Sequence, residues 1–467
     1  MLTRLAVPLV AVALLAGGAA ADARAPSIPA VAGAVDIGDP YFAEDGNGGI
    51  DVLEYDVHDA YRFSDRRISG WTTVTLRTTQ RLRSFDLDFL LPVSDVTLST
   101  GRATFRRPDA HELRITPHRP LAAGTRVRVR VEYAGHPQRF RWAGESNWVA
   151  NDHEVVAMNE PHMAPWWFPA NDHPLDKALM HLFITVPRER RVIANGTLAG
   201  VRRHGARATY HWESGGPMAS YLAFFAAGDF AVRSGTSHHL RYEVAVSRQL
   251  GAGPRHAAMR GLLRTPGIVA WLSTQLGRYP FPVTGGLVTA LNPGFSLENQ
   301  TRPTYPRGVS RLLMVHELAH QWVGDSVSVH HWRDVWLNEG FATFMEELWT
   351  ADHGGRATRS WLHQAYDEET SPSFWSLVVS DPGPRHLFDW PVYERGAMTL
   401  AALRVRIGHG AFAHLLKRWT AVHRHEHGTT TQFEALAARV SGQDLTSFFD
   451  AWVHQGTKPE PTAANGL

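Results

Sequence analysis

The stretch MVHELAHQWVGDSVSVHHWRDVWLNEGFATF, residues 314–344, decides how the second half of this chain is organised. Apolar residues recur in it at the spacing of helical turns. Ser310, just before the stretch, is a suitable N-cap, and Gly324 is a suitable helix stop. The sequence therefore predicts a helix here that carries His316 and His320.

These two histidines point to a metal site. Residues i and i+4 lie on one face of a helix, so the imidazoles of His316 and His320 can bind one zinc ion at roughly 2.0–2.1 Å. Glu317 flanks that face and can reach a zinc-bound water. Glu339, nineteen residues after His320, opens a second predicted helix and supplies a third ligand. Three protein ligands with an open fourth position are typical of a catalytic zinc.

Chance must be weighed, because the chain contains 26 histidines. A lone His-Glu-x-x-His pattern is a moderate signal, and its histidines could simply be buried and hydrogen-bonded. The third ligand makes that alternative the weaker one. Three other features have an ordinary interpretation: the run at 423–427 is expected to be solvated, His330 and His331 to pack or lie at the surface, and Trp166-Trp167 to pack the first domain.

The N-terminus predicts export. Arg4 precedes the apolar run LAVPLVAVALLA, and small residues follow, with cleavage expected after Ala21 or Ala23. Residues 1–23 are therefore predicted to be a signal peptide, since the run is shorter than the roughly twenty residues that span a bilayer. The chain has no cysteine, which excludes disulfides and a lipidated cysteine anchor. A secreted, extracellular protein is expected.

Composition limits the class of protein. The chain has 467 residues, of which 44% are hydrophobic and 20% charged, as in globular proteins with a sizeable core. Two or three domains are expected at this length. The formal net charge of +2 argues against a nucleic-acid binder.

Periodicity divides the chain and predicts an α+β, multidomain fold. Residues 24–45, rich in proline, alanine and glycine, are predicted to be a mobile segment that leads into the first domain. Runs such as RVRVRVEYAG alternate apolar with polar residues, so 46–232 is predicted to be an antiparallel, sandwich-like β-domain. From there the apolar spacing becomes helical, so 233–457 is predicted to be a mainly helical domain. The end, 458–467, is expected to be a flexible tail.

The spacing of the predicted metal ligands, with WLNEGFA around the last one, resembles the zinc aminopeptidases typified by aminopeptidase N and leukotriene A-four hydrolase, the gluzincin aminopeptidases. The resemblance covers about Asp39 to Pro459. It implies a thermolysin-like catalytic domain with one Zn²⁺ per chain. The chain ends where the family's catalytic domain ends, so it is expected to lack the helical C-terminal domain of longer members and to have a more open cleft.

Two further segments share motifs with that family. FSLENQ, residues 295–300, is similar to the family's G-x-M-E-N motif, which implies that Glu298 binds the α-amine of the substrate and that the neighbouring Asn299 belongs to the substrate site. Phe295 and Leu297 depart from the motif, which puts substrate placement in question. VYERGAM is similar to the family's tyrosine motif, which implies that Tyr393 stabilises the oxyanion.

A segment of the β-domain, residues 158–174, also resembles the family. The match implies that Glu160 reaches the same amine. Taken together, the expected function is removal of N-terminal amino acids from peptides by zinc-activated water, with Glu317 as general base. Peptides with a free N-terminus are the expected partners. A zinc endopeptidase, an epoxide hydrolase and a catalytically silent binding protein remain as alternatives.

Overall fold

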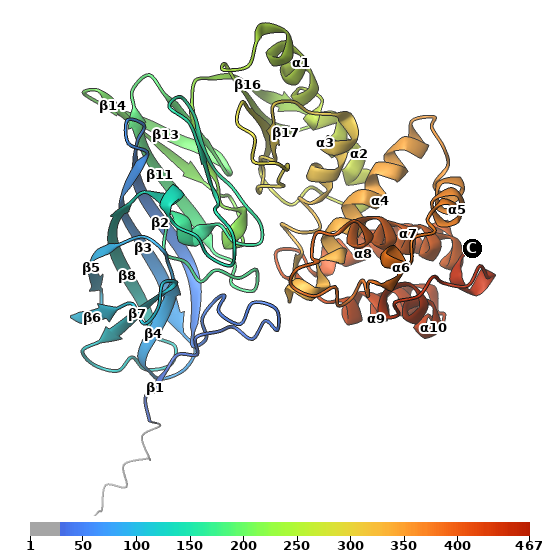
Figure 1. The fold of residues 1–467 in the computed structure, drawn as a ribbon, viewed down its shortest axis with the longest axis horizontal. Coiled ribbons are helices and arrows are strands. Elements are labelled where there is room, and N and C mark those ends of the chain that lie inside the picture. The colour runs from blue at the N-terminus through green and yellow to red at the C-terminus, as the bar shows by residue number, and fades with distance from the viewer. Residues whose placement is uncertain (1–28) are drawn as a thin grey trace, which may run out of the picture.

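The computed structural model describes residues 29–467 (Figure 1). The predicted signal peptide lies outside the described residues. A β-rich part, blue to green in Figure 1, stands beside a mainly helical part, orange to red, and a small sheet with two helices joins them. This is the predicted α+β arrangement. Among the described residues, no helix is both long and apolar enough to cross a membrane.

The largest sheet of the β-domain has seven strands. Its order is β13-β14-β11-β2-β3-β8-β5, and only the β11–β2 pair is parallel. The alternation read in residues 126–135 gives β8 one buried face, with Val127, Val129 and Val131 fully buried. The strand bounds are β2 Ile50–Arg62, β3 Arg67–Thr78, β5 Val93–Leu98, β8 Arg126–Gly135, β11 Leu179–Pro187, β13 Thr197–His204 and β14 Arg207–Glu213.

Two four-stranded sheets complete the β-domain, with orders β1-β4-β7-β6 and β12-β15-β10-β9. Both contribute to the hydrophobic core shared with the large sheet, so the sandwich-like prediction describes this domain well. The strand bounds are β1 Val31–Ala32, β4 Leu82–Asp88, β6 Ala103–Arg106, β7 Glu112–Pro117, β9 Trp148–Ala150, β10 Val155–Ala157, β12 Arg191–Ala194 and β15 Phe225–Gly228. Short 3₁₀ helices lie at Pro137–Arg139, Ala164–Trp166 and Ser220–Leu222.

A fourth sheet, β16-β17-β18-β19, opens the second half of the chain. Its first pair is antiparallel and the other two are parallel. The expected boundary between 232 and 233 cuts through β16, because that strand pairs with β17 and so belongs to the second unit. The bounds are β16 Phe230–Ser237, β17 Leu240–Ser247, β18 Val283–Thr289 and β19 Thr304–Pro306.

The helical part begins with α1 and α2 beside this sheet. The predicted N-cap is confirmed, since the Ser310 side chain accepts a hydrogen bond from the Leu313 N–H at 3.2 Å. The helix ends earlier than predicted, at Ala319, and the turn continues through His320. The bounds are α1 Ala252–Leu262, α2 Thr265–Leu276, α3 Arg311–Ala319, α4 Trp336–Asp352, α5 Thr358–Glu368, α6 Pro372–Ser376, α7 Trp390–Ile407, α8 His409–Val422, α9 Thr430–Ser441 and α10 Thr446–Phe449. Shorter elements are β20 Ser328–Val329, β21 His427–Gly428, the 3₁₀ turns Trp332–Asp334 and Ala463–Asn465, and the π turn Asp450–His454.

Helices α4 and α7 cross at two glycines. A Cβ atom added to Gly340 would lie 2.8 Å from the Gly396 Cα, and one added to Gly396 would lie 2.9 Å from the Gly340 Cα. The backbones can meet this closely only because neither residue has a side chain. The crossing brings Glu339 on α4 and Tyr393 on α7 to one cavity.

The expected mobile lead differs from the structure over residues 29–45. Asp39 is buried, and its Oδ2 atom accepts the Trp332 N–H at 2.8 Å and lies 3.1 Å from His173 Nε2. The carboxylate therefore joins the lead, the β-domain and the segment between the two ligand helices. A Pro/Ala/Gly-rich composition did not reveal these contacts because they are made across the fold.

The expected flexible tail also packs against the body of the domain. The Lys458 ammonium donates to the backbone carbonyls of Tyr366 and Glu369 at 2.6 and 3.0 Å. The Trp452 indole donates to the Asn465 carbonyl at 3.0 Å. Backbone acceptors of this kind leave no pattern in the sequence.

Candidate active site

A cavity of about 400 Å³ lies between the two halves of the molecule. Seven of the eight residues predicted from sequence line it: Glu160, Glu298, His316, Glu317, His320, Glu339 and Tyr393. One of them belongs to the β-domain and the others to the second half of the chain. A junction between structural units is a common place for a ligand pocket.

Three of these side chains fit a zinc ion. Glu339 Oε2 lies 3.3 Å from His316 Nε2 and 3.5 Å from His320 Nε2. Two ligands bound tetrahedrally at roughly 2.0–2.1 Å are about 3.4 Å apart. The two imidazoles and one carboxylate therefore converge at the spacing and with the donor types that a zinc ion requires.

The remaining imidazole nitrogens are held by groups that sequence reasoning missed. His316 Nδ1 lies 2.9 Å from Glu346 Oε1, and His320 Nδ1 lies 3.1 Å from the Val323 carbonyl. Such partners fix the orientation and tautomer of metal-binding histidines. A signal for Glu346 did exist, because it lies two helical turns after Glu339 and hence on the same face of α4.

Charge is concentrated in the cavity. Burial by itself raises the pKa of Glu339, but the imidazoles of His320 and His316 outweigh this and lower it to about 2. Burial raises the pKa of Glu317 to about 8, which the two histidines partly oppose and Glu298 and Glu339 reinforce. The Glu339 carboxylate is thus held ionised, whereas the Glu317 carboxyl group can carry a proton.

Two carboxylates approach the cavity from different directions. Glu298 is buried, its Oε1 accepts the Tyr221 hydroxyl at 3.1 Å, and its backbone carbonyl accepts the Gln321 amide at 2.8 Å. Glu160 has an Oε1 atom with no hydrogen-bond partner among residues 29–467. Burial and the neighbouring Glu298 raise the pKa of Glu160 well above its usual value. An added cation would relieve this crowding of negative charge.

Tyr393 faces the metal ligands from α7. Its ring lies nearly parallel to the His316 ring, with centroids 6.0 Å apart. Burial, followed by the nearby carboxylate of Glu339, raises the pKa of the phenol far above its usual value. The hydroxyl therefore stays protonated and can donate a hydrogen bond into the cavity.

Asn299 differs from its prediction. It is fully buried, its side-chain amide donates to the Leu222 carbonyl at 3.2 Å, and the cavity lining does not include it. Asn299 thus ties the 295–300 segment to the β-domain instead of facing a substrate. Phe295, where the sequence departs from the family motif, does line the cavity and is 38% exposed.

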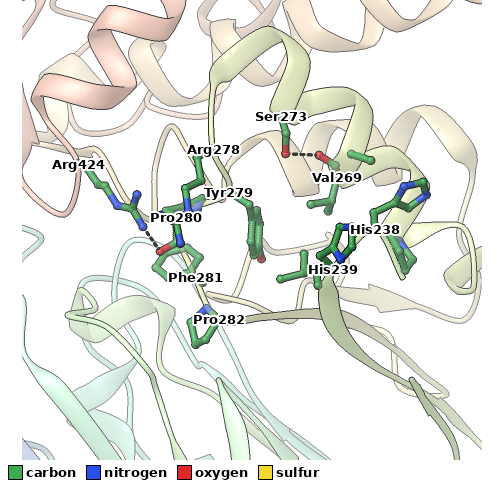
Figure 2. A pocket seen from close by; sticks show the side chains of 13 residues that line it. His238, His239, Val269, Ser273, Arg278, Tyr279, Pro280, Phe281, Pro282 and Arg424 are labelled. Carbon is green, nitrogen blue, oxygen red and sulfur yellow. Dashed lines mark hydrogen bonds between the residues drawn. The ribbon is translucent and has the colours of Figure 1, made fainter. Parts of the chain in front are cut away.

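A second cavity is larger, about 650 Å³, but contains none of the predicted residues (Figure 2). Its wall consists of Tyr279, prolines and other apolar groups, with Arg278, Arg424 and the His238-His239 turn at its sides. Arg424 Nη2 donates to the Pro280 carbonyl at 2.7 Å. The size of a cavity therefore does not identify the candidate active site. The metal-binding type side chains that converge on the smaller cavity do.

Known proteins match the chain along most of its length. The model of the peptidase M1 N-terminal domain matches residues 53–222, and that of the peptidase family M1 domain matches residues 286–452. The two matched domains follow one another in the order that the fold shows, a β-rich domain before a mainly helical one. The chain belongs to the M1 peptidase family, and the resemblance stated from the sequence is confirmed.

Curated relatives are longer than this chain. Aminopeptidase N of Lactococcus lactis subsp. lactis is 24% identical over 416 residues, covering 80% of this chain and 47% of the relative. Aminopeptidase N of Lactococcus lactis subsp. cremoris is 28% identical over 385 residues, covering 72% of this chain and 43% of the relative. The chain thus spans less than half the length of either relative.

A solved structure matches both domains. The M1 zinc metallopeptidase from Deinococcus radiodurans, as a mutant bound to a Tyr-Ser-Ala substrate, is 27% identical, with a TM-score of 0.82. The match covers 91% of this chain and 100% of that one. This supports the order of a β-rich domain followed by a helical peptidase domain.

Proposed function

We propose that the protein is a zinc-dependent aminopeptidase that removes N-terminal residues from peptides. The observation that carries the proposal is the convergence of seven side chains on one cavity, with a three-ligand metal set at its centre. Family membership adds to this, since the matched relatives are named as aminopeptidases and zinc metallopeptidases.

The reaction follows from the placement of these side chains. When bound by His316, His320 and Glu339, zinc supplies Lewis-acid polarisation of a carbonyl and lowers the pKa of water to about 7. Glu317 takes a proton from the attacking water and delivers it to the leaving amine. The Tyr393 hydroxyl donates to the carbonyl oxygen as negative charge develops there.

Selection of a free N-terminus rests on Glu298 and Glu160. An α-amine has a pKa of about 7.7–8.0 and is largely cationic at neutral pH. Two carboxylates beside the metal set would pair with that ammonium and so fix the register of cleavage to the first peptide bond. The Tyr221 hydroxyl, which donates to Glu298 at 3.1 Å, holds one of the two carboxylates in place from the β-domain.

Hydrolysis of aminoacyl-4-nitroanilides, each with and without an N-acetyl group, tests the proposal. We expect cleavage of the free-amine substrates only, loss of activity with a chelator, and recovery with zinc. Glu298→Gln and Glu160→Gln should raise KM for free-amine substrates more than they lower kcat. Equal cleavage of acetylated substrates would instead indicate an endopeptidase, and a zinc-loaded protein without any hydrolysis would indicate a binding protein.

We also propose that the protein is exported. The support is the N-terminal sequence alone, with Arg4, an apolar run and small residues before the predicted cleavage point. Expression of the full chain in a bacterial host, with N-terminal sequencing of the product outside the cytoplasm, tests this. Recovery of only intact, intracellular protein would contradict it.

A further inference from the structure

A second group of metal-type donors lies inside the β-domain. Asp88 is the last residue of β4, Glu112 is the first residue of β7, and the two are direct partners in the antiparallel pair. His111 precedes Glu112. All three side chains are at most 5% exposed, and none lines the active-site cavity.

Hydrogen bonds account for only one of these three side chains. Asp88 accepts from the Gly46 N–H at 3.1 Å, the Asp172 N–H at 2.5 Å and the Asn47 side-chain amide at 3.0 Å. Both carboxylate oxygens of Glu112 and both ring nitrogens of His111 have no hydrogen-bond partner among residues 29–467. Buried polar atoms in this number require a partner of some kind.

The distances fit a shared ion better than direct hydrogen bonds. His111 Nδ1 lies 3.5 Å from Glu112 Oε1 and 3.7 Å from Asp88 Oδ1. A nitrogen–oxygen hydrogen bond is usually about 2.7–3.2 Å long. The separations are close to the 3.3 and 3.5 Å found among the active-site ligands. Trp142 stacks on the His111 ring, with centroids 4.1 Å apart and planes within 5°, and so fixes its orientation.

Repulsion between the Asp88 and Glu112 carboxylates also favours a bound cation. Like charges directly opposite each other in paired strands are unfavourable, and burial makes the repulsion stronger. A bound cation would relieve this repulsion. Burial raises the pKa of Asp88 well above its usual value and that of Glu112 to about 8, so a proton shared between the two carboxylates is the competing arrangement.

We propose that Asp88, His111 and Glu112 bind one divalent cation with a structural role. Imidazole nitrogen together with carboxylate oxygen suits zinc or manganese, whereas calcium and magnesium prefer oxygen ligands alone. The ion would join β4 to β7. Through Asp88 it would also steady Asn47 and Asp172, and Asp172 belongs to the 158–174 segment that carries Glu160.

Metal analysis of the full chain, purified after expression with added zinc and manganese, tests the proposal. We expect two divalent ions per chain. Brief treatment with a chelator should remove the ion in the open active-site cavity together with activity, and leave the buried ion bound. Glu112→Gln should contain one ion fewer than the wild type and keep its kcat, because the substitution is isosteric and distant from the cavity.

Another donor group provides a control. His181, His211 and Glu213 lie on the exposed face of the large sheet, with donor separations of 3.4 to 4.0 Å and side-chain exposures of 27% to 48%. An ion there would exchange freely with solvent. If the chelator-resistant ion is lost in His211→Gln and retained in Glu112→Gln, the proposal is wrong.

Thermal unfolding gives an independent test. The direction in which Glu112→Gln changes Tm differs between a bound cation and a proton shared by the two carboxylates. With a bound cation, Glu112→Gln lowers Tm by several degrees and removes the stabilisation that the ion provides. Without one, it leaves Tm unchanged or raises it, because one of two opposed carboxylates is gone. The matched control is Asp86→Asn, on the same strand, whose carboxylate pairs with Arg114 at 2.6 Å. It should lower Tm and leave the metal content unchanged.

Three results would overturn the proposal: one ion or fewer in the wild type, an unchanged or raised Tm for Glu112→Gln, or a second ion that is calcium or magnesium only. Chelator-resistant zinc or manganese that disappears in Glu112→Gln would support it.

Discussion

The two buried donor groups differ in how the chain assembles them. At the active site, His316 and His320 come from one helical turn, and Glu339 comes from the next helix. In the β-domain, Asp88 and Glu112 meet because β4 pairs with β7. The first arrangement leaves a motif in the sequence, whereas the second depends on strand register and leaves none.

They also differ in access. The active-site donors line an open cavity, and the β-domain donors are sealed beneath Trp142 and the 45–47 segment. An open ligand position permits chemistry, whereas a closed set permits only structural support. The two proposed metal sites would therefore have different roles, catalytic at the open cavity and structural in the β-domain.

Replacing the predicted general base tests this contrast most strongly. Glu317→Gln should lower kcat by about 10²–10⁴-fold, because proton transfer to and from the substrate is lost. The zinc content should stay at the wild-type level. The measurement is steady-state hydrolysis of an aminoacyl-4-nitroanilide, with Glu112→Gln as the matched control. Comparable loss of kcat in both variants would abolish the distinction between the two donor groups.

Removing the tyrosine hydroxyl should have the next largest effect. Tyr393→Phe should lower kcat by about 10²–10³-fold with little change in KM, as expected when a donor to the developing oxyanion is lost. Substrate binding and turnover are separated by kinetics over a range of substrate concentrations. A rise in KM at unchanged kcat would place Tyr393 in ground-state binding instead.

The partner of His316 should affect metal affinity. Glu346→Gln should weaken zinc binding or activity by about 10- to 100-fold, because it leaves the imidazole less firmly oriented and less basic. Competition with a chromogenic chelator measures the affinity. Glu347→Gln is the control, since Glu347 also lines the cavity but pairs with Arg356 at 3.8 Å. Equal weakening in both variants would show a general charge effect.

The helix crossing predicts a smaller change, in stability. Gly396→Ala should lower the free energy of unfolding by about 1–3 kcal/mol, because its Cβ would collide with Gly340 and force α4 and α7 apart. Activity should fall as Tyr393 moves away from the metal ligands. At Gly410 on α8, an added Cβ meets no atom of the described residues within 4 Å beyond its chain neighbours and the nearby backbone of its own helix. Gly410→Ala should therefore leave both stability and activity near the wild-type values, as chemical denaturation and kinetics can check.

Several elements of the fold were predictable because their signals are local. Alternation along β8 and the N-cap at Ser310 each depend on neighbours within a few residues. The positions of Asp39 and Lys458 were not predictable, since both bind backbone groups that are distant in sequence. Composition suggested mobile ends, and tertiary contacts reversed that expectation.

The sequence by itself determined the family, and it predicted the metal ligands, the general base and the tyrosine, because helical periodicity and motif spacing carry that information over short distances. Only the tertiary structure decided that Glu160 and Glu298 line one cavity from two domains, that Asn299 lies outside its lining, and that Asp88, His111 and Glu112 converge. The reason is physical. Register, helix crossings and domain contacts arise from packing among residues far apart in the chain, and no local pattern records which of them will meet.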